Sequence, residues 1–471
     1  MEIPFIGGAY QGRSTSFNAQ QSINCFPAYD KNQPKTAVAM YGTPGTLEFS
    51  DTEYGAYEVR GMVGLGSYFI AVVGARIFKV ASNGTATAID TGEDLSTSSG
   101  YVGMASNGVH VLIVDGTTDA KIVTDTTITN IDETDDYPQS DDCTFFDGYF
   151  LVHEVNTGRF YLSGLYDGTT WNPLDFATAE SSPDNLIGLG STKQNIWLFG
   201  IKTVEVYFNS GNADFPFERV PGAINDIGCN AVGSICNAKG VLFWLTSNNT
   251  IARSNGYAYE EISTESINYQ ISTYATVNNA RGFYYEVEGE VYYAINFPTP
   301  QKTWVVNIRT NDWFEWQTDD DQFRGICSIQ WFDKMLIGDR SDSRIFQLSM
   351  NTYTDDGEPI KRVRRAQYIS KERFNILHHR LELDFEFGVG LNVAEEADGY
   401  DPQAVLRWSD DGGNTWSSSY SVSIGKYQEY TSRAIWRRLG KSRNRIYELT
   451  VDEPVKFVLI GAYSNLISCK V

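Results

Sequence analysis

The sequence of 471 residues predicts an all-β protein, and three observations carry this prediction. Short apolar segments with a period of two residues recur along the chain, bounded by Gly, Asn, Asp and Ser, a pattern typical of strands joined by turns. Aromatic residues make up 14% of the chain and Gly occurs 42 times, which favours strands and tight turns over long helices. The sequence shows no sustained stripe with the 3.6-residue period of a helix.

A loose repeat of a short apolar strand, a tight turn and a second strand organises the first three quarters of the chain. Small antiparallel sheets of this kind cannot cover both of their faces alone, but they can pack radially around an axis. The repeat therefore predicts an irregular β-propeller of six to seven blades in residues 1–355, with residues 1–50 as a candidate interface arm. A multi-sheet sandwich is the alternative, because the repeat carries no WD or kelch signature. The repeat units are residues 61–81, 103–124, 145–163, 187–208, 233–254, 282–308 and 325–348.

The repeat stops near residue 355, where a basic stretch begins. We expect a basic linker at residues 356–370, followed by a second domain at 371–471. Within that domain Leu381, Leu383, Phe385 and Phe387 alternate with charged residues, the pattern of a half-buried antiparallel strand. Further strand and turn signals continue to the apolar run at 455–462. The C-terminal part is therefore predicted to be a β-sandwich-like domain.

The charge of the chain is unevenly distributed. The formal net charge is −22, which argues against a general affinity for nucleic acid or for anionic membranes. Residues 359–471 hold 17 Lys and Arg against 14 Asp and Glu, a net charge of +3, so residues 1–358 hold 20 against 45, a net charge of −25. The two parts are expected to face different partners, although an acidic surface is more often explained by solubility alone.

The residues with catalytic chemistry do not form a recognisable constellation. The sequence has no nucleophile elbow, phosphate-binding loop or metal-binding His-Glu helix. The run from Asp319 to Asp321 reads as a solvated turn, and His110 and His153 lie in strand-like segments and read as structural histidines.

The N-terminus lacks a signal peptide, and no stretch is long and apolar enough to span a membrane. We expect a protein that is not an enzyme and has no cofactor or metal, with six isolated cysteines as small buried residues: Cys25, Cys143, Cys229, Cys236, Cys327 and Cys469.

The sharpest local motif runs from residue 409 to residue 416. Its pattern, S-x-D-x-G-x-T-W, matches the Asp box of sialidase-like propellers, in which the Asp and Gly build a hairpin turn and the Trp packs beneath it. A single copy outside the repeat indicates a structural turn rather than sugar chemistry. The residues expected to form this turn are Ser409, Asp411, Gly413, Thr415 and Trp416.

Two basic clusters lie in the C-terminal part, at residues 361–365 and 433–445. Arg interleaved with Trp suits phosphate contacts and also suits a protein interface. We favour a protein interface for the second cluster, with a solvated face as the simpler alternative. The expected interface residues are Arg433, Trp436, Arg437, Arg438, Arg443 and Arg445.

Short strings spread over nearly the whole chain resemble the packaged-DNA stabilisation proteins, which are the tail-hub or nozzle proteins of short-tailed, podovirus-type bacteriophages. Individually these strings are weak, but their order and spacing together indicate the family. The most specific ones lie in the C-terminal part. The strings are residues 20–27, 42–45, 182–190, 203–207, 407–412, 425–426, 437–443 and 458–462.

This resemblance implies a structural subunit of the virion tail, made in the bacterial host cytoplasm. It implies a homo-oligomer, a hexameric ring below the portal and its adaptor (head-completion) protein, which closes the DNA exit, retains packaged DNA and carries a tail needle, tailspike or fibre proteins. Double-stranded DNA would pass the channel without specific binding, and no membrane contact is expected. The alternative function is that of a carbohydrate-binding or sialidase-like propeller, suggested by the Asp box and the aromatic residues.

Overall fold

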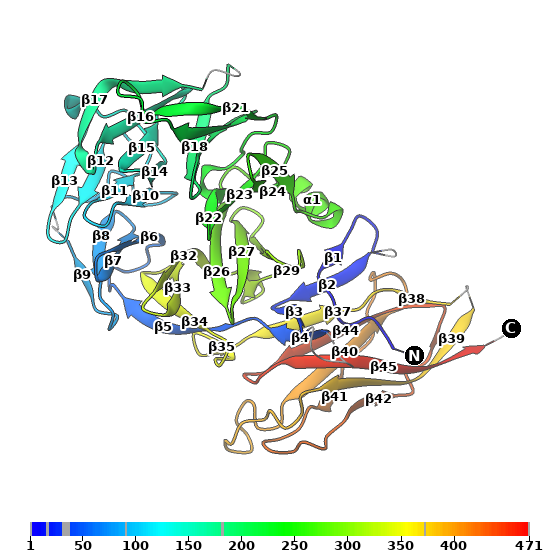
Figure 1. Ribbon diagram of the computed structural model, residues 1–471. Helices are drawn as coiled ribbons and strands as arrows, with labels where there is room; N and C mark the ends of the chain where they lie inside the picture. Colours follow the sequence, from blue (N-terminus) through cyan, green and yellow to red (C-terminus); the bar gives the residue numbers. More distant parts are fainter. Residues whose placement is uncertain are drawn as a thin grey trace.

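The computed structural model describes residues 2–15, 18–30, 38–89, 92–179, 183–371 and 374–469. Over these residues the chain folds into a seven-bladed β-propeller followed by a β-sandwich, and the two lie against each other (Figure 1). The predicted fold class is therefore confirmed. Each of the seven repeat units recognised in the sequence coincides with the first three strands of one blade.

Each blade is a four-stranded antiparallel sheet. Blades 1 to 3 are β6 (Val59–Leu65), β7 (Tyr68–Val73), β8 (Arg76–Val80), β9 (Ala86–Ala88); β10 (Gly103–Ser106), β11 (Val111–Val114), β12 (Ala120–Val123), β13 (Ile128–Ile131); and β14 (Cys143–Phe146), β15 (Tyr149–His153), β16 (Arg159–Gly164), β17 (Asp167–Thr178). Blades 4 and 5 are β18 (Leu186–Ser191), β19 (Ile196–Gly200), β20 (Val204–Asn209), β21 (Phe217–Asn225); and β22 (Cys236–Ala238), β23 (Val241–Leu245), β24 (Ile251–Asn255), β25 (Ala258–Glu261). Blades 6 and 7 are β26 (Arg281–Val287), β27 (Glu290–Phe297), β28 (Lys302–Asn307), β29 (Trp313–Glu315); and β32 (Gly325–Trp331), β33 (Lys334–Asp339), β34 (Arg344–Ser349), β5 (Gly45–Asp51).

The second strand of most blades is an almost continuous apolar run, because neighbouring blades cover both of its faces. In blade 7, Leu336 packs toward blade 1 and Ile337 packs toward blade 6. In blade 1, Phe69 packs toward blade 7 and Ile70 packs toward blade 2. The propeller therefore has a hydrophobic cluster at each boundary between neighbouring blades instead of one central core.

A strand from the N-terminal segment closes the propeller. Strand β5 pairs antiparallel with β34, in a register that runs from Arg344 opposite Asp51 to Ser349 opposite Gly45. The innermost strand of each blade contacts that of the next, and β32 contacts β6, so the circle is complete. Residues 45–51 therefore belong to blade 7, so residues 45–50 are not part of the candidate interface arm at 1–50. This pairing has no local signal in the sequence, because β34 lies about 300 residues after β5.

The C-terminal sandwich consists of two sheets that enclose a second core, which includes Leu381, Leu383, Leu406, Leu449 and Leu459. Residues from the N-terminal segment extend both sheets. In the first sheet the order is β2 (Ala19–Ile23), β37 (Lys361–Arg365), β44 (Asn444–Asp452), β40 (Gln403–Ser409) and β41 (Tyr420–Ser423), with β1 (Tyr10–Gln11) beside β2 and β38 (Ile369–Ser370) beside β44. In the second sheet the order is β3 (Cys25–Tyr29), β4 (Val38–Gly42), β45 (Val458–Cys469), β39 (Asn375–Phe385) and β42 (Ala434–Arg437), with β43 (Lys441–Ser442) beside β39.

The expected linker at 356–370 is not a separate connector, which corrects the sequence interpretation. Residues Lys361–Arg365 form β37, which pairs with β2 on one side and with β44 on the other. Strand β2 also meets blade 6, where Ile23 lies opposite Glu315 in a parallel pair. The basic composition was misleading because alternate arginines of this strand point into the protein, where they bind backbone carbonyls.

The remaining elements are short. They include β30 (Gln317–Thr318) paired with β31 (Asp321–Gln322), β35 (Thr354–Asp355) paired with β36 (Glu358–Pro359), and α1 (Glu265–Ser272), whose N-cap is Thr264. Two single 3-10 turns cover Glu133–Asp135 and Val232–Ser234. In the described part of the chain, no helix is both long enough and apolar enough to cross a membrane.

Candidate interaction surfaces

The Asp-box motif forms a tight turn after β40. The Asp411 carboxylate accepts hydrogen bonds from the backbone N–H of Thr415 at 2.9 Å, the Thr415 hydroxyl at 2.6 Å and the Ser409 hydroxyl at 2.7 Å. The hydrogen bonds from Thr415 and Ser409 lower the pKa of Asp411 to about 2. Gly413 has φ +96°, a backbone conformation that favours glycine. The turn uses its own polar groups internally, as a structural turn requires.

Trp416 of the same turn packs against two arginines. The guanidinium carbons of Arg365 and Arg407 are 4.9 and 4.8 Å from the centre of its ring, within cation–π distance. Both arginines also pair with Glu448, whose side chain is 2% exposed. Arg365 binds one oxygen of this carboxylate through Nε at 2.9 Å and Nη2 at 2.6 Å. Trp416 thus lies against the two arginines that pair with the buried Glu448.

Two of the six residues expected at an interface are buried inside the sandwich. Trp436 is 3% exposed, belongs to the hydrophobic core and donates its indole N–H to the Tyr420 carbonyl at 2.8 Å. Arg445 is 1% exposed and binds both carboxylate oxygens of Asp410, at 2.7 and 2.8 Å. We therefore correct the sequence interpretation, because neither side chain has enough exposed surface to contact a partner.

The other four expected interface residues are exposed and gather at one edge of the second sandwich sheet. With Lys441 they form a surface that we call the arginine edge. The side chain of Arg433 is 65% exposed and pairs with Glu382 at 2.8 Å. Arg437 lies opposite Arg380 in the β39–β42 ladder, so positive charge accumulates there. The members of the arginine edge are Arg433, Arg437, Arg438, Lys441 and Arg443.

The first basic cluster has a different role, at the junction between the domains. Arg364 is fully buried and donates hydrogen bonds to the carbonyls of Phe5, Gly8 and Gln21 and to the Ser22 hydroxyl. These groups all belong to the N-terminal segment. Burial lowers the pKa of Arg364 to about 10. The guanidinium therefore acts as a tie that holds the N-terminal segment on the sandwich.

Arg362 lies in the same strand and is also buried, at 1% exposure. It donates hydrogen bonds to the carbonyls of Ile360 and Glu453 at 3.2 Å and of Tyr353 at 3.4 Å. Burial lowers its pKa to about 10 as well. Gly42 is required beside it, because a Cβ at that position would lie 2.5 Å from Nε of Arg362.

Asn24 connects the propeller and the sandwich through its side chain. Its amide donates to the Lys361 carbonyl at 2.9 Å, and its amide oxygen accepts from the Gln317 N–H at 2.8 Å. Its backbone N–H donates to the Glu315 carbonyl at 2.9 Å. The residue is 3% exposed and has φ +53°, a conformation that Asn tolerates better than most residues. Asn24 thus joins blade 6, the N-terminal segment and β37 through its side chain and its backbone N–H.

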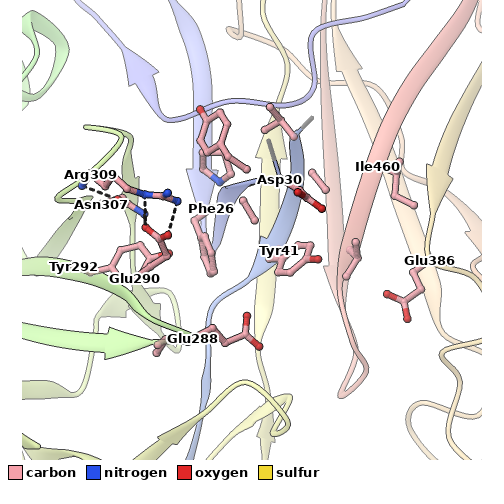
Figure 2. A pocket seen from close by; sticks show the side chains of 17 residues that line it. Phe26, Asp30, Tyr41, Glu288, Glu290, Tyr292, Asn307, Arg309, Glu386 and Ile460 are labelled. Atoms are coloured by element: carbon pink, nitrogen blue, oxygen red, sulfur yellow. Dashed lines mark hydrogen bonds and ion pairs between the residues drawn. The ribbon is translucent and has the colours of Figure 1, made fainter. Parts of the chain in front are cut away.

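A cleft of about 510 Å³ lies between blade 6 and the sandwich, with the hairpin β3–β4 as its floor (Figure 2). Aromatic side chains line it, including Phe26, Tyr29, Tyr41 and Tyr292. Its four carboxylates come from three separate segments, and Figure 2 shows them around the aromatic floor. Among the described residues that line the cleft, Arg309 is the one basic residue. The carboxylates are Asp30, Glu288, Glu290 and Glu386.

Glu290 and Glu386 of the cleft pair with basic side chains. Glu290 accepts from Nε of Arg309 at 3.0 Å, and Glu386 lies 2.7 Å from Nζ of Lys456. Glu288 is exposed at the turn between β26 and β27. Among the described lining residues, acidic side chains outnumber basic ones beside the aromatic faces. No sequence motif marks it, because its residues are brought together only when the two domains pack.

His153 and His378 are buried in different domains. His153 is buried 2.7 Å from Asp141 in blade 3, whereas His378 lies in the sandwich between Tyr447 and Ser442, at 2.8 and 2.9 Å. Burial lowers the pKa of His378 to about 4. Within the described ranges no group of three or more His, Cys, Asp or Glu residues could hold a metal ion.

The acidic run at 319–321 lies in the hairpin β30–β31, and two of its side chains are paired. Asp320 lies 2.8 Å from Lys361, and Asp321 lies 3.0 Å from Arg340.

Five cysteines are free thiols. Cys25, Cys143 and Cys229 are buried, and Cys236 and Cys327 are partly buried. The side chain of Cys469 lies outside the described residues.

Two family models match the chain. The family described as bacteriophage P22 Gp10, beta-propeller, matches residues 1–353, and the family described as bacteriophage P22 Gp10, beta-sandwich, matches residues 361–466. The search among curated proteins found no match. Among solved structures, the computationally designed Ika8 protein is similar over 64% of this chain and 99% of its own, with 9% identity and a TM-score of 0.41, which is too low to support an argument.

Proposed function

The chain belongs to the family of bacteriophage P22 Gp10, the tail-hub and DNA-stabilisation protein of podoviruses, and we propose that its copies form a ring that closes the DNA exit of a short-tailed phage. It is a structural protein of the phage tail. The observation that carries the proposal is the match of both domains, in the same order, to the two parts of this family. The ring would be a hexamer, bound to the portal adaptor above and to a needle, spikes or fibres below.

The proposed role is mechanical and needs no catalysis. DNA must be held during storage and must leave quickly during ejection. A channel wall rich in Lys and Arg would bind phosphates with a strongly salt-dependent affinity and slow the exit. The acidic excess of residues 1–358, a net charge of −25, would instead repel the DNA backbone. We propose that part of this acidic surface lines the channel.

The arginine edge is the proposed assembly surface. Arg binds carboxylates through two parallel hydrogen bonds and stacks on aromatic rings, which suits a protein interface. Because Trp436 and Arg445 are buried, the proposed surface consists only of the exposed basic residues around β42 and β43. The carbohydrate alternative loses its main support, because the polar groups of Ser409, Asp411 and Thr415 bind one another within the turn.

Particles that lack this protein test the proposal. Heads packaged in cells without the gene should fill with DNA and then lose it, measured as genome copies protected from nuclease in purified particles. Adding the purified wild-type protein should restore protection and place the chain in the tail when the particles are viewed by cryo-electron microscopy. Heads that keep their DNA without this chain would disprove the retention function.

A further inference from the structure

Two loops form one end of the sandwich. Residues 386–402 join β39 to β40, and residues 424–433 join β41 to β42. Connections longer than about 12–15 residues without secondary structure are uncommon in compact domains and are usually functional, which applies to the first loop. The two loops hydrogen-bond to each other through their backbones, for example from the Gly390 N–H to the Gly425 carbonyl at 3.2 Å. They therefore hold each other in place and present one continuous surface.

This surface is acidic. Residues 387–402 and 424–432 carry five carboxylates against one lysine, Lys426. A hydrogen bond to Tyr400 and the charges of Asp401 and Glu395 raise the pKa of Lys426, whose Nζ lies 4.5 Å from the centre of the Tyr400 ring. In the described part of the chain, no basic side chain forms an ion pair with any of the five carboxylates. The five, which we call the acidic end, are Glu395, Glu396, Asp398, Asp401 and Glu429.

The negative charge of the acidic end continues into the turn after β44. The Gly399 N–H donates to the Glu453 carboxylate at 3.1 Å. Burial and the charges of Asp398 and Asp452 raise the pKa of Glu453, as expected where carboxylates crowd together.

The other cations near this turn are already engaged. Lys361, which lies opposite Asp452 in the β37–β44 ladder, pairs with Asp320 at 2.8 Å. Lys456 pairs with Glu386, and Arg362 is buried among carbonyls. The acidic end therefore keeps an excess of negative charge that a partner could balance.

The arginine edge extends toward the opposite end of the sandwich. Arg443 directly precedes β44, and Asp452 is the last residue of this strand. At about 3.3 Å per residue, the nine steps between them span roughly 30 Å. Neither charged end can therefore neutralise the other within one chain.

The positive charge of the arginine edge is also largely unbalanced. Glu382 pairs with Arg380 and Arg433. Among the described residues, no carboxylate pairs with the other four members of the edge. These four are Arg437, Arg438, Lys441 and Arg443.

We propose that these four residues of one copy of this chain dock against the acidic end of the next copy. Two tyrosines of the second loop, Tyr427 at 52% and Tyr430 at 70% exposure, lie beside the carboxylates. A guanidinium group can pair with a carboxylate and stack on an aromatic ring at the same time, and tyrosine offers a large contact area at a low cost in side-chain entropy.

A contact of this kind joins two different surfaces of identical subunits. Such a head-to-tail contact closes into a ring when the rotation between neighbours allows. Opposite charges at the two ends of one sandwich fit this arrangement. The inference rests on the proposed ring and names the loops and the basic residues that would join its subunits.

Charge reversal at both ends of the same chain tests the docking. In particles from a phage that lacks the gene, supplied with each variant, R437E/R438E and E396R/D398R should each lower the infectious titre by at least about tenfold, since like charges then face each other. The chain with all four substitutions should recover most of the titre, because every contact again joins opposite charges. An adaptor or another tail protein as the partner of either end predicts no recovery in the fourfold variant.

The matched control is K193E/K202E, which makes the same change in net charge as R437E/R438E at two exposed lysines on the propeller and should leave the titre unchanged. Each variant is first checked for folding by its near-UV circular dichroism and melting temperature. As a second measurement that does not reverse charges, a chain with D398C and R438C is treated with a short bis-maleimide in assembled particles. It should give a ladder of linked copies, while each single cysteine variant gives none.

The outcomes separate the docking from the proposed function. No recovery in the fourfold variant, together with no ladder, would overturn the docking, and the function would stand if wild-type chain is still found in particles and retains DNA. Normal titre for both charge-reversed pairs would also overturn it. Absence of the wild-type chain from purified particles would remove both the docking and the function.

Discussion

Replacement of Arg364 by Ala should loosen the junction between the domains. The substitution removes four hydrogen bonds, to the carbonyls of Phe5, Gly8 and Gln21 and to the Ser22 hydroxyl. At about 1–3 kcal/mol for each unsatisfied buried group, the loss is roughly 8 kcal/mol. Removal of the buried cation offsets part of it. The lowering of the Arg364 pKa from 12.5 to about 10 corresponds to roughly 3 kcal/mol.

The net expected cost of Arg364→Ala is therefore about 3–5 kcal/mol, since the two effects oppose each other and water can satisfy some of the freed carbonyls. The free energy of unfolding is measured by urea denaturation followed by tryptophan fluorescence. Hydrogen exchange should show early loss of protection in residues 2–23, while the strands of blades 2 to 4 keep theirs. These blades share no contact with the substituted side chain.

The matched control is Arg438→Ala, an exposed arginine for which we expect a change within about 0.5 kcal/mol. If Arg364→Ala unfolds within about 1 kcal/mol of the wild type and residues 2–23 stay protected, the guanidinium is not the tie that its hydrogen bonds indicate. A large loss of stability spread equally over all seven blades would also contradict the argument, because it would place the effect in the propeller.

Two further predictions concern the sandwich. Gly413→Val should lower the free energy of unfolding by about 1–3 kcal/mol, because a β-branched residue is strained at φ +96°, and an unchanged melting temperature would show that the turn tolerates a side chain. His378 has a pKa of about 4 in the folded protein against 6.5 ordinarily, so the unfolded chain takes up its proton first as the pH falls. Its contribution to stability is complete above about pH 6.5 and is lost as the pH falls toward 4. His378→Gln should flatten this part of the pH–stability curve, and an equally steep curve in the variant would exclude His378 as its source.

The blades could be predicted from the sequence because their signals are local. A middle strand such as Val111–Val114 is apolar at every position, since both of its faces are covered, and the turns around it are rich in Gly and Asp. The same holds for the Asp-box turn, where all the partners lie within seven residues of one another. Local patterning therefore predicted the repeat, the fold class and this turn.

The junction could not be predicted in the same way, because its partners are far apart in the chain. Arg364 binds groups more than 340 residues before it, and Asn24 binds Lys361 across 337 residues. Nothing near Arg362 or Arg364 distinguishes them from surface arginines. For Trp436 a signal existed, since alternation along β42 places it on the same side as the buried Ala434. Arg445 depends on Asp410, which lies 35 residues before it.

The N-terminal segment makes the two domains one unit rather than two bodies on a hinge. Strand β5 is part of blade 7, β2 pairs with β37 of the sandwich, and β4 pairs with β45. If the N-terminal strands stay on the sandwich, separating the domains breaks the β2–β29 pair and the hydrogen bonds of Asn24 with Glu315 and Gln317. Bending at residues 356–360 alone would not be enough. A subunit built in this way would transmit a force on its sandwich to the propeller through the β2–β29 pair and the chain from β4 to β5, which would suit the proposed DNA-retaining ring.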